Sequence, residues 1–290
     1  MDETTRLHTA GRRYCEARFS EWVQVYQDLQ RKENWRVENL FKPGWDYSEE
    51  AYRTFPRYRV AKNTQIEIER LRVDPGMSLT EVRKFLIAAS VKAEAQFQNE
   101  LKNKVAQVVI HEEAEDFRIY IEALTLRDLM QVEPLPYRRV LSKDESEQLW
   151  DGLRRAWSIG DNYWFPLKKG AMPQNILAFH TDYFESIDGQ HILRDALERR
   201  GVSAVFLLHE FGDPEYEVAL GIFEPGYRDG GEQYSTSVHA DWIVYASHES
   251  SITVGGGWLI DAFRRLHPEC IGLTYKGPYS TPDRRGTWKT

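Results

Sequence analysis

The chain has 290 residues, of which 41% are hydrophobic and 29% charged, and its formal net charge is −7. This balance is typical of a globular protein with a packed core and excludes an intrinsically disordered chain. No apolar run is long enough to span a bilayer, and the polar N-terminus lacks a signal-peptide pattern, so we expect no membrane contact and a cytoplasmic location.

Residues 1–133 predict a helical domain whose role is structural. Apolar residues recur there at spacings of three and four, which is the pattern of an amphipathic helix. The run Ser78-Leu79-Thr80-Glu81 has the form of a capping box, which opens a helix. We expect helices over residues 12–31, over 61–71 after Pro56, from Ser78 onward, over 104–123 and, as a short turn, over 126–130.

Pro134 and Pro136 mark a boundary, because two prolines at that spacing favour extended chain. Beyond it the sequence predicts an α+β domain over residues 137–276, followed by a basic tail over 277–290. Tight turns between consecutive strands imply an antiparallel sheet with helices packed on one face. We expect strands over 163–167, 176–180, 202–209, 216–222, 241–247 and 251–254, and helices after Ser142, over 190–200 and over 258–267.

The acidic excess of the chain lies in residues 203–250. Nine acids and one base, Arg228, give this segment a charge of −8, so the rest of the chain carries about +1 of the total of −7. Such a segment is either a solvated face that keeps the protein soluble or a contact surface for a basic protein partner. For the second hypothesis, the predicted contact residues are acids and tyrosines at turns and strand ends: Glu210, Asp213, Glu215, Glu217, Tyr216, Tyr227 and Tyr234.

Two His-x-Asp pairs are the candidate metal ligands, namely His180 with Asp182 and His239 with Asp241. Side chains at positions i and i+2 of a strand point to the same side, so each pair offers an imidazole and a carboxylate together. A divalent metal ion with an open coordination position would make such a site hydrolytic, provided that the pairs converge. The alternative is that these histidines cap strands and serve only the fold.

The triple glycine Gly255-Gly256-Gly257 stands between a predicted strand and a predicted helix. A phosphate loop is disfavoured there, because no Lys or Arg lies within it and the neighbouring acids would repel an anion. The glycines instead predict a sharp turn and close helix–sheet packing. The residues Ser247-His248-Glu249 have the types of a hydrolytic triad, but adjacent residues cannot all face one point, so this match is interpreted as coincidental.

Nucleic-acid binding is not expected. Six pairs of adjacent arginines occur, but they are dispersed along the chain. The isoelectric point near 5.7 is also far below the basic values typical of nucleic-acid-binding domains. The sequence also lacks a Walker loop, a Gly-x-Ser-x-Gly elbow and a His-Glu-x-x-His motif.

Two hypotheses about function follow from the sequence. The first is an immunity- or inhibitor-like interaction protein that presents acidic and aromatic side chains to a basic protein partner. The second is a hydrolase, with or without a divalent metal, that uses the His and Asp groups of the second domain. The oligomeric state and the identity of the partner or substrate are left open, and no residue is assigned as catalytic.

Overall fold

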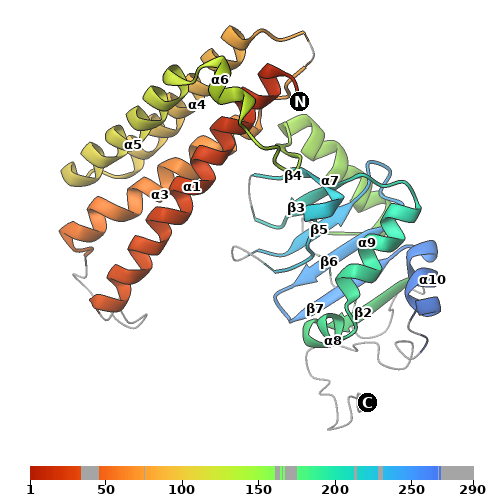
Figure 1. The fold of residues 1–290 in the computed structure, drawn as a ribbon. Coiled ribbons are helices and arrows are strands. Elements are labelled where there is room, and N and C mark those ends of the chain that lie inside the picture. Colours follow the sequence, from red (N-terminus) through yellow and green to blue (C-terminus); the bar gives the residue numbers. More distant parts are fainter. Residues whose placement is uncertain are drawn as a thin grey trace. The chain divides into compact units, whose positions relative to one another are not determined.

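The computed structural model describes residues 1–33, 46–74, 76–160, 164, 166, 175–211, 214–227, 231–266 and 268. The chain divides into two compact units, Met1–Leu135 and Pro136–Thr290 (Figure 1). The helices in the described part of the chain do not combine the length and the apolar character that a membrane crossing requires.

The first unit is a bundle of helices. Its core is a cluster of buried side chains from several helices, among them Leu7 and Cys15, Leu86, and Phe117 and Ile121. The capping box predicted at Ser78 is present, and the other expected helices are found. The helices are α1 (Glu3–Lys32), α3 (Glu49–Glu69), α4 (Leu79–Glu100), α5 (Lys104–Ala123) and α6 (Leu126–Met130).

Helix α3 begins earlier than the sequence predicted. The expectation was a start after Pro56, but Pro56 lies inside the helix. The side chain of Ser48 accepts a hydrogen bond from the Ala51 amide and so caps the helix about two turns before the proline. The cap fixes the start of the helix, and burial of Phe55 and Pro56 offsets the hydrogen bond that the proline cannot donate.

A buried carboxylate ties three helices of the first unit together. Glu113 of α5 accepts hydrogen bonds from Arg18 of α1 at 2.6 Å and from the indole of Trp22 at 3.0 Å, and Arg57 of α3 lies 3.4 Å away. A buried charge is stable only when it is paired and hydrogen-bonded, so these partners hold α1, α3 and α5 in register.

The second unit confirms the α+β class. Among the described residues, seven strands form one sheet in the order β1-β4-β3-β5-β6-β7-β2, and every neighbouring pair is antiparallel. The strands are β1 (Arg138–Val140), β2 (Ile176–His180), β3 (Ala204–His209), β4 (Tyr216–Ala219), β5 (Gln233–Thr236), β6 (Ile243–Ser247) and β7 (Ser251–Gly255). The helices are α7 (Lys143–Trp157), α8 (Thr181–Ser186), α9 (Gly189–Arg199) and α10 (Gly257–Leu266), with a 3₁₀ turn at Leu220–Ile222.

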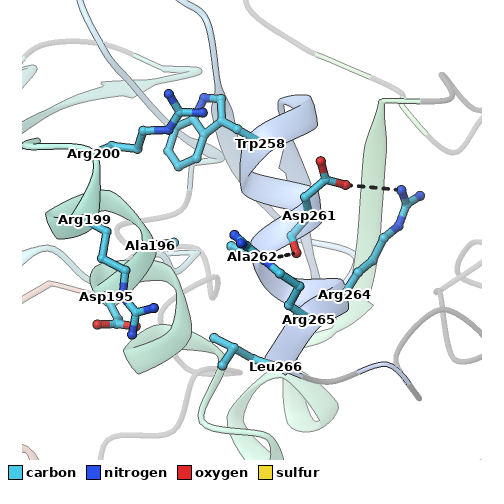
Figure 2. Close-up of a pocket in the computed structure, with 10 residues that line it drawn as sticks. All are labelled: Asp195, Ala196, Arg199, Arg200, Trp258, Asp261, Ala262, Arg264, Arg265 and Leu266. Atoms are coloured by element: carbon cyan, nitrogen blue, oxygen red, sulfur yellow. Dashed lines mark hydrogen bonds and ion pairs between the residues drawn. The ribbon is translucent and has the colours of Figure 1, made fainter.

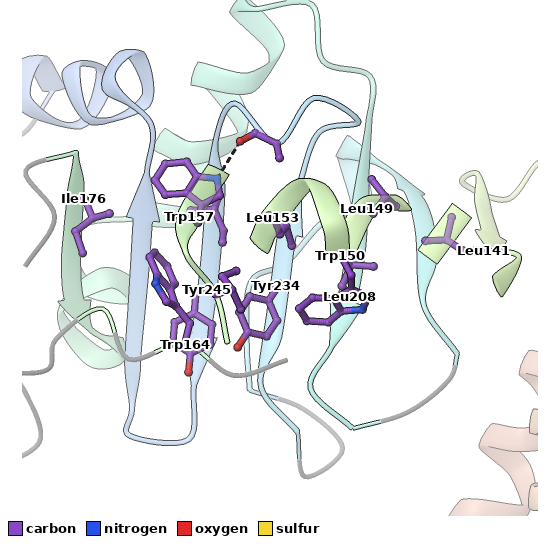
Figure 3. Close-up of a cluster of buried hydrophobic side chains, with 13 residues drawn as sticks. Leu141, Leu149, Trp150, Leu153, Trp157, Trp164, Ile176, Leu208, Tyr234 and Tyr245 are labelled. Carbon is purple, nitrogen blue, oxygen red and sulfur yellow. Dashed lines mark hydrogen bonds between the residues drawn. The ribbon is translucent and has the colours of Figure 1, made fainter. Parts of the chain in front are cut away.

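Helices cover both faces of this sheet, whereas the sequence predicted one. Trp150 and Trp157 of α7 pack into an aromatic core on one face (Figure 3). Phe263 of α10 packs on the opposite face against Phe179 of β2, with ring centroids 5.4 Å apart. The reason is that β6 and β7 are buried along their whole length, so both of their faces need an apolar cover.

Three elements of this unit were not predicted, namely β1, β5 and α8. Strand β5 reads Gln-Tyr-Ser-Thr, and its burial is complete although three of its four side chains are polar. No apolar alternation marks such a strand in the sequence. The strand expected over 163–167 lies largely outside the described residues, as do residues 212–213 of the turn before β4 and the basic tail over 277–290.

The triple glycine has the predicted structural role. A Cβ on Gly255 would lie 2.7 Å from Ile243 Cγ2 and 2.7 Å from Trp157 Cζ3. Gly256 adopts φ = +114°, which L side chains rarely allow. The close approach of α7 to β6 and β7 therefore depends on Gly255, and the turn from β7 into α10 depends on Gly256.

We expect Gly255→Ala to lower the free energy of unfolding by about 1–3 kcal/mol, because the new methyl group overpacks the contact with Trp157. Gly257→Ala is the matched control, since a Cβ there meets nothing within 4 Å. Urea unfolding followed by tryptophan fluorescence measures both. Equal stabilities of the two variants would contradict the close packing.

Candidate functional site

Three of the predicted contact residues are inside the second unit. Glu215, Tyr216 and Tyr234 are buried, and Tyr234 is 0% exposed. The Glu215 carboxylate accepts hydrogen bonds from the Trp150 indole at 2.8 Å and from the Ser146 hydroxyl. It thereby joins α7 to the start of β4. The prediction that these three side chains face a partner is wrong, because all three are buried within the unit.

Glu217 is also committed to a contact within the unit. Its carboxylate lies 2.9 Å from the Arg139 guanidinium and accepts a hydrogen bond from Tyr137 at 2.9 Å. The same guanidinium forms a two-point contact with Glu145 and lowers the pKa of that carboxyl to about 2. Asp213, another predicted contact residue, lies outside the described residues.

The two His-x-Asp pairs do not converge. His180 ends β2 opposite Ser251, whereas His239 and Asp241 lie in the connection between β5 and β6. That connection leads into β6 beside Gly255, at the other end of β7, and four residues of strand separate the two ends by about 13 Å. The metal site built from both pairs is therefore ruled out by the sheet register.

Each pair has a local structural role. The His180 imidazole accepts a hydrogen bond from the Asp182 amide and so caps α8. The Asp241 carboxylate accepts a hydrogen bond from the Ser237 hydroxyl in the turn before β6. Across the part of the chain that the structure describes, there is no group of three or more His, Cys, Asp or Glu side chains arranged to hold a metal ion.

A different carboxylate, Glu232, gathers polar side chains at the end of the sheet. Glu232 precedes β5, and its side chain is 5% exposed. One carboxylate oxygen accepts a hydrogen bond from the Tyr245 hydroxyl. The other lies 3.0 Å from the Ser247 hydroxyl and 2.6 Å from Nδ1 of His248. The alternation of β6 places Tyr245 and Ser247 on the same face, and the strand register brings both beside Glu232.

Glu210 lies next to this buried carboxylate. The Glu210 amide donates to the Glu232 carbonyl at 3.0 Å, which extends the pairing of β3 with β5 by one residue. Burial, and then repulsion by the charge of Glu232, raise the pKa of the Glu210 carboxyl. Among the described residues no Lys or Arg pairs with Glu210, so its charge is only weakly compensated.

Two exposed aromatic side chains flank the carboxylates. Phe211 is 73% exposed, and it lies beside Gly231, which precedes Glu232. Tyr227 is 47% exposed, and its ring centroid is 6.3 Å from that of His248. Large apolar side chains so exposed are informative when they are grouped around polar ones. We call Glu210, Phe211, Tyr227, Glu232 and His248 the rim cluster.

His248 is the exposed member of a His–carboxylate pair. Its side chain is 59% exposed, while its Nδ1 is held by the buried Glu232. This contact fixes the orientation of the ring and turns Nε2 away from the carboxylate, which is the arrangement that a general base needs. Ser247 donates to the same carboxylate, so its hydroxyl is not positioned on His248.

Of the rim cluster, the sequence identified Glu210 and Tyr227 as site residues and missed the other three. Glu232 lies more than ten residues before its partners, and no spacing rule links them. Phe211 follows Glu210 directly in a predicted turn, and an aromatic residue in a turn was the one available signal.

Comparisons with protein-family models, with curated proteins and with solved structures found no match. The function is therefore inferred from the geometry of this chain.

We expect Glu232→Gln to lower the pKa of Glu210, because the substitution removes the neighbouring charge but preserves the shape of the side chain. Side-chain carboxyl NMR over a pH titration measures the change. Asp241→Asn, a substitution at the far end of β6, is the control and is expected to leave Glu210 unchanged. An unchanged pKa in Glu232→Gln would show that the two carboxyl groups do not interact.

Proposed function

We propose that this chain is an interaction protein whose rim cluster binds a basic segment of a protein partner. The observation that carries the proposal is the close pair of carboxyl groups, Glu210 and Glu232, beside two exposed aromatic rings. The proposal keeps the basic partner expected from the sequence and replaces most of the expected contact residues.

Electrostatics favours a cation at this place. The raised pKa of Glu210 means that its charged form is destabilised by burial and by Glu232. A guanidinium or ammonium group beside the Glu210 carboxylate would offset that repulsion and gain charge-assisted hydrogen bonds. Arginine fits best, because its planar fork donates to two oxygens at once.

Phe211 and Tyr227 supply the apolar part of the contact. A cation near an aromatic face gains about 0.5–1 kcal/mol at an exposed site. Exposed aromatic side chains also act as anchors that bury a large area in an interface. The negative charge of residues 203–250 would in addition steer a basic protein towards this end of the sheet. An immunity- or inhibitor-like protein with a basic target would use these features.

The test uses an arginine-rich peptide as the probe, with titration calorimetry as the measurement. We expect Glu210→Gln to weaken binding about tenfold, because one charge-assisted hydrogen bond is lost. Phe211→Ala should weaken binding without changing its salt dependence. Affinity should also fall as the pH drops through the raised pKa of Glu210, above the ordinary value of 4.5.

Glu198→Gln provides the matched control, since Glu198 is an exposed acid on α9 with no part in the rim cluster. Its affinity for the peptide should equal that of the unaltered protein. Equal losses in Glu198→Gln and Glu210→Gln would mean that the peptide responds to net charge only, and the proposal would fail.

A second candidate function is hydrolysis with His248 as general base. The 2.6 Å contact between His248 Nδ1 and the buried Glu232 favours it. With Ser247 turned to Glu232, the group that His248 activates would be a water molecule.

For this second function the probe is p-nitrophenyl acetate, and the measurement is its rate of hydrolysis as a function of pH. We expect His248→Gln to reduce the rate by about 100-fold or more if His248 is the base. His239→Gln is the control, because His239 is an exposed histidine at the other end of β6. Equal rates in both variants would remove the hydrolase from consideration.

A further inference from the structure

A groove runs between α9 and α10, on the face of the sheet opposite α7. Its volume is about 740 Å³, which lies within the range of small-molecule sites. Figure 2 shows its lining, which brings together residues some 60 positions apart in the sequence. The lining residues are Asp195, Ala196, Arg199, Arg200, Trp258, Asp261, Ala262, Arg264, Arg265 and Leu266.

Positive charge dominates this lining. Four arginines and two aspartates give a net charge of +2, in a chain whose net charge is −7. Arg199 pairs with Asp195 at 2.7 Å, and Arg264 lies 3.7 Å from Asp261. Among the described residues no carboxylate pairs with Arg200 or Arg265. The groove therefore has positive charge available for an anion.

Two of the six arginine pairs of the sequence meet in this groove. Arg199 and Arg200 end α9, and Arg264 and Arg265 lie in the last turn of α10. Both pairs extend from short helices that pack on one another, so the fold assembles a cationic site that linear spacing does not show.

An aromatic surface lies at one end of the groove. The Arg200 guanidinium lies 4.9 Å from the centroid of the Trp258 ring, and Figure 2 shows the two side chains together. A stacked arginine and tryptophan form a platform for a planar ring. Arg265 lies seven residues further along α10, which is about 10 Å along the helix axis. A nucleotide spans a comparable distance from its base to its terminal phosphate.

We propose that the groove between α9 and α10 binds a nucleoside polyphosphate. Its base lies against Trp258 and Arg200, and its phosphates lie towards Arg199 and Arg265. The Trp258 ring beside the arginines favours this ligand over inorganic phosphate or an acidic peptide without aromatic side chains, since neither has a planar group to stack. The site is independent of the rim cluster, because it uses other elements on the other face of the sheet.

Titration calorimetry with ATP, inorganic triphosphate and a short single-stranded oligothymidylate tests the proposal on the full chain. We expect ATP to bind. Arg265→Gln and Arg199→Gln should each lower the affinity for ATP about tenfold, since each removes a charge-assisted contact to phosphate. Trp258→Leu should lower the affinity for ATP and leave the affinity for inorganic triphosphate unchanged. Should Trp258→Leu fail to fold, Arg200→Gln tests the same platform.

Arg155→Gln is the matched control, because Arg155 is an exposed arginine near the end of α7, outside the groove. ATP affinity unchanged in this control and lowered in the groove variants supports the site. Four results would overturn it: no binding of ATP at millimolar concentration, equal losses in Arg155→Gln and Arg265→Gln, no difference between ATP and triphosphate, or an oligothymidylate that binds far more tightly than ATP.

Discussion

The burial of β6 and β7 on both faces is the constraint on which the second unit depends. All five residues of each strand are buried, so the sheet must be covered twice. Trp157 of α7 approaches one face closely enough to leave no room for a side chain on Gly255. Phe263 of α10 closes the other face against Phe179. Helices α9 and α10 form this second cover, and the groove lies between them.

Double burial also explains why acidic residues lie inside the unit. Where the sheet ends, polar groups that are shut off from water need partners, and a carboxylate can accept several hydrogen bonds at once. The Glu215 carboxylate, at the start of β4, accepts a hydrogen bond from Trp150. The Glu232 carboxylate contacts three polar side chains around the end of β6. Part of the acidic segment 203–250 is thus internal structure.

The two proposed sites of the second unit have opposite character. The rim cluster joins two neighbouring carboxyl groups, Glu210 and Glu232, to exposed aromatic rings, which suits a cation. The groove joins arginines to Trp258, which suits an anion with a planar group. They lie on different elements, so a basic partner and a phosphorylated ligand would not compete for the same side chains. A protein of this kind would bind its partner with one end of the sheet and its ligand with the helices of the opposite face.

The sequence by itself determined the α+β class, the presence of the helices of the first unit, though not the start of α3, and the close packing at Gly255. The spacing of apolar residues, the capping boxes and the glycine geometry are local properties, so they can be recognised in the sequence. It did not determine β5, whose side chains are mostly polar, or the burial of Tyr234. Those follow from strand order, which is set by contacts between distant residues. The same reason explains the sites: tertiary structure separated the two His-x-Asp pairs by the length of a strand, and it brought His248 to Glu232 and two arginine pairs into one groove.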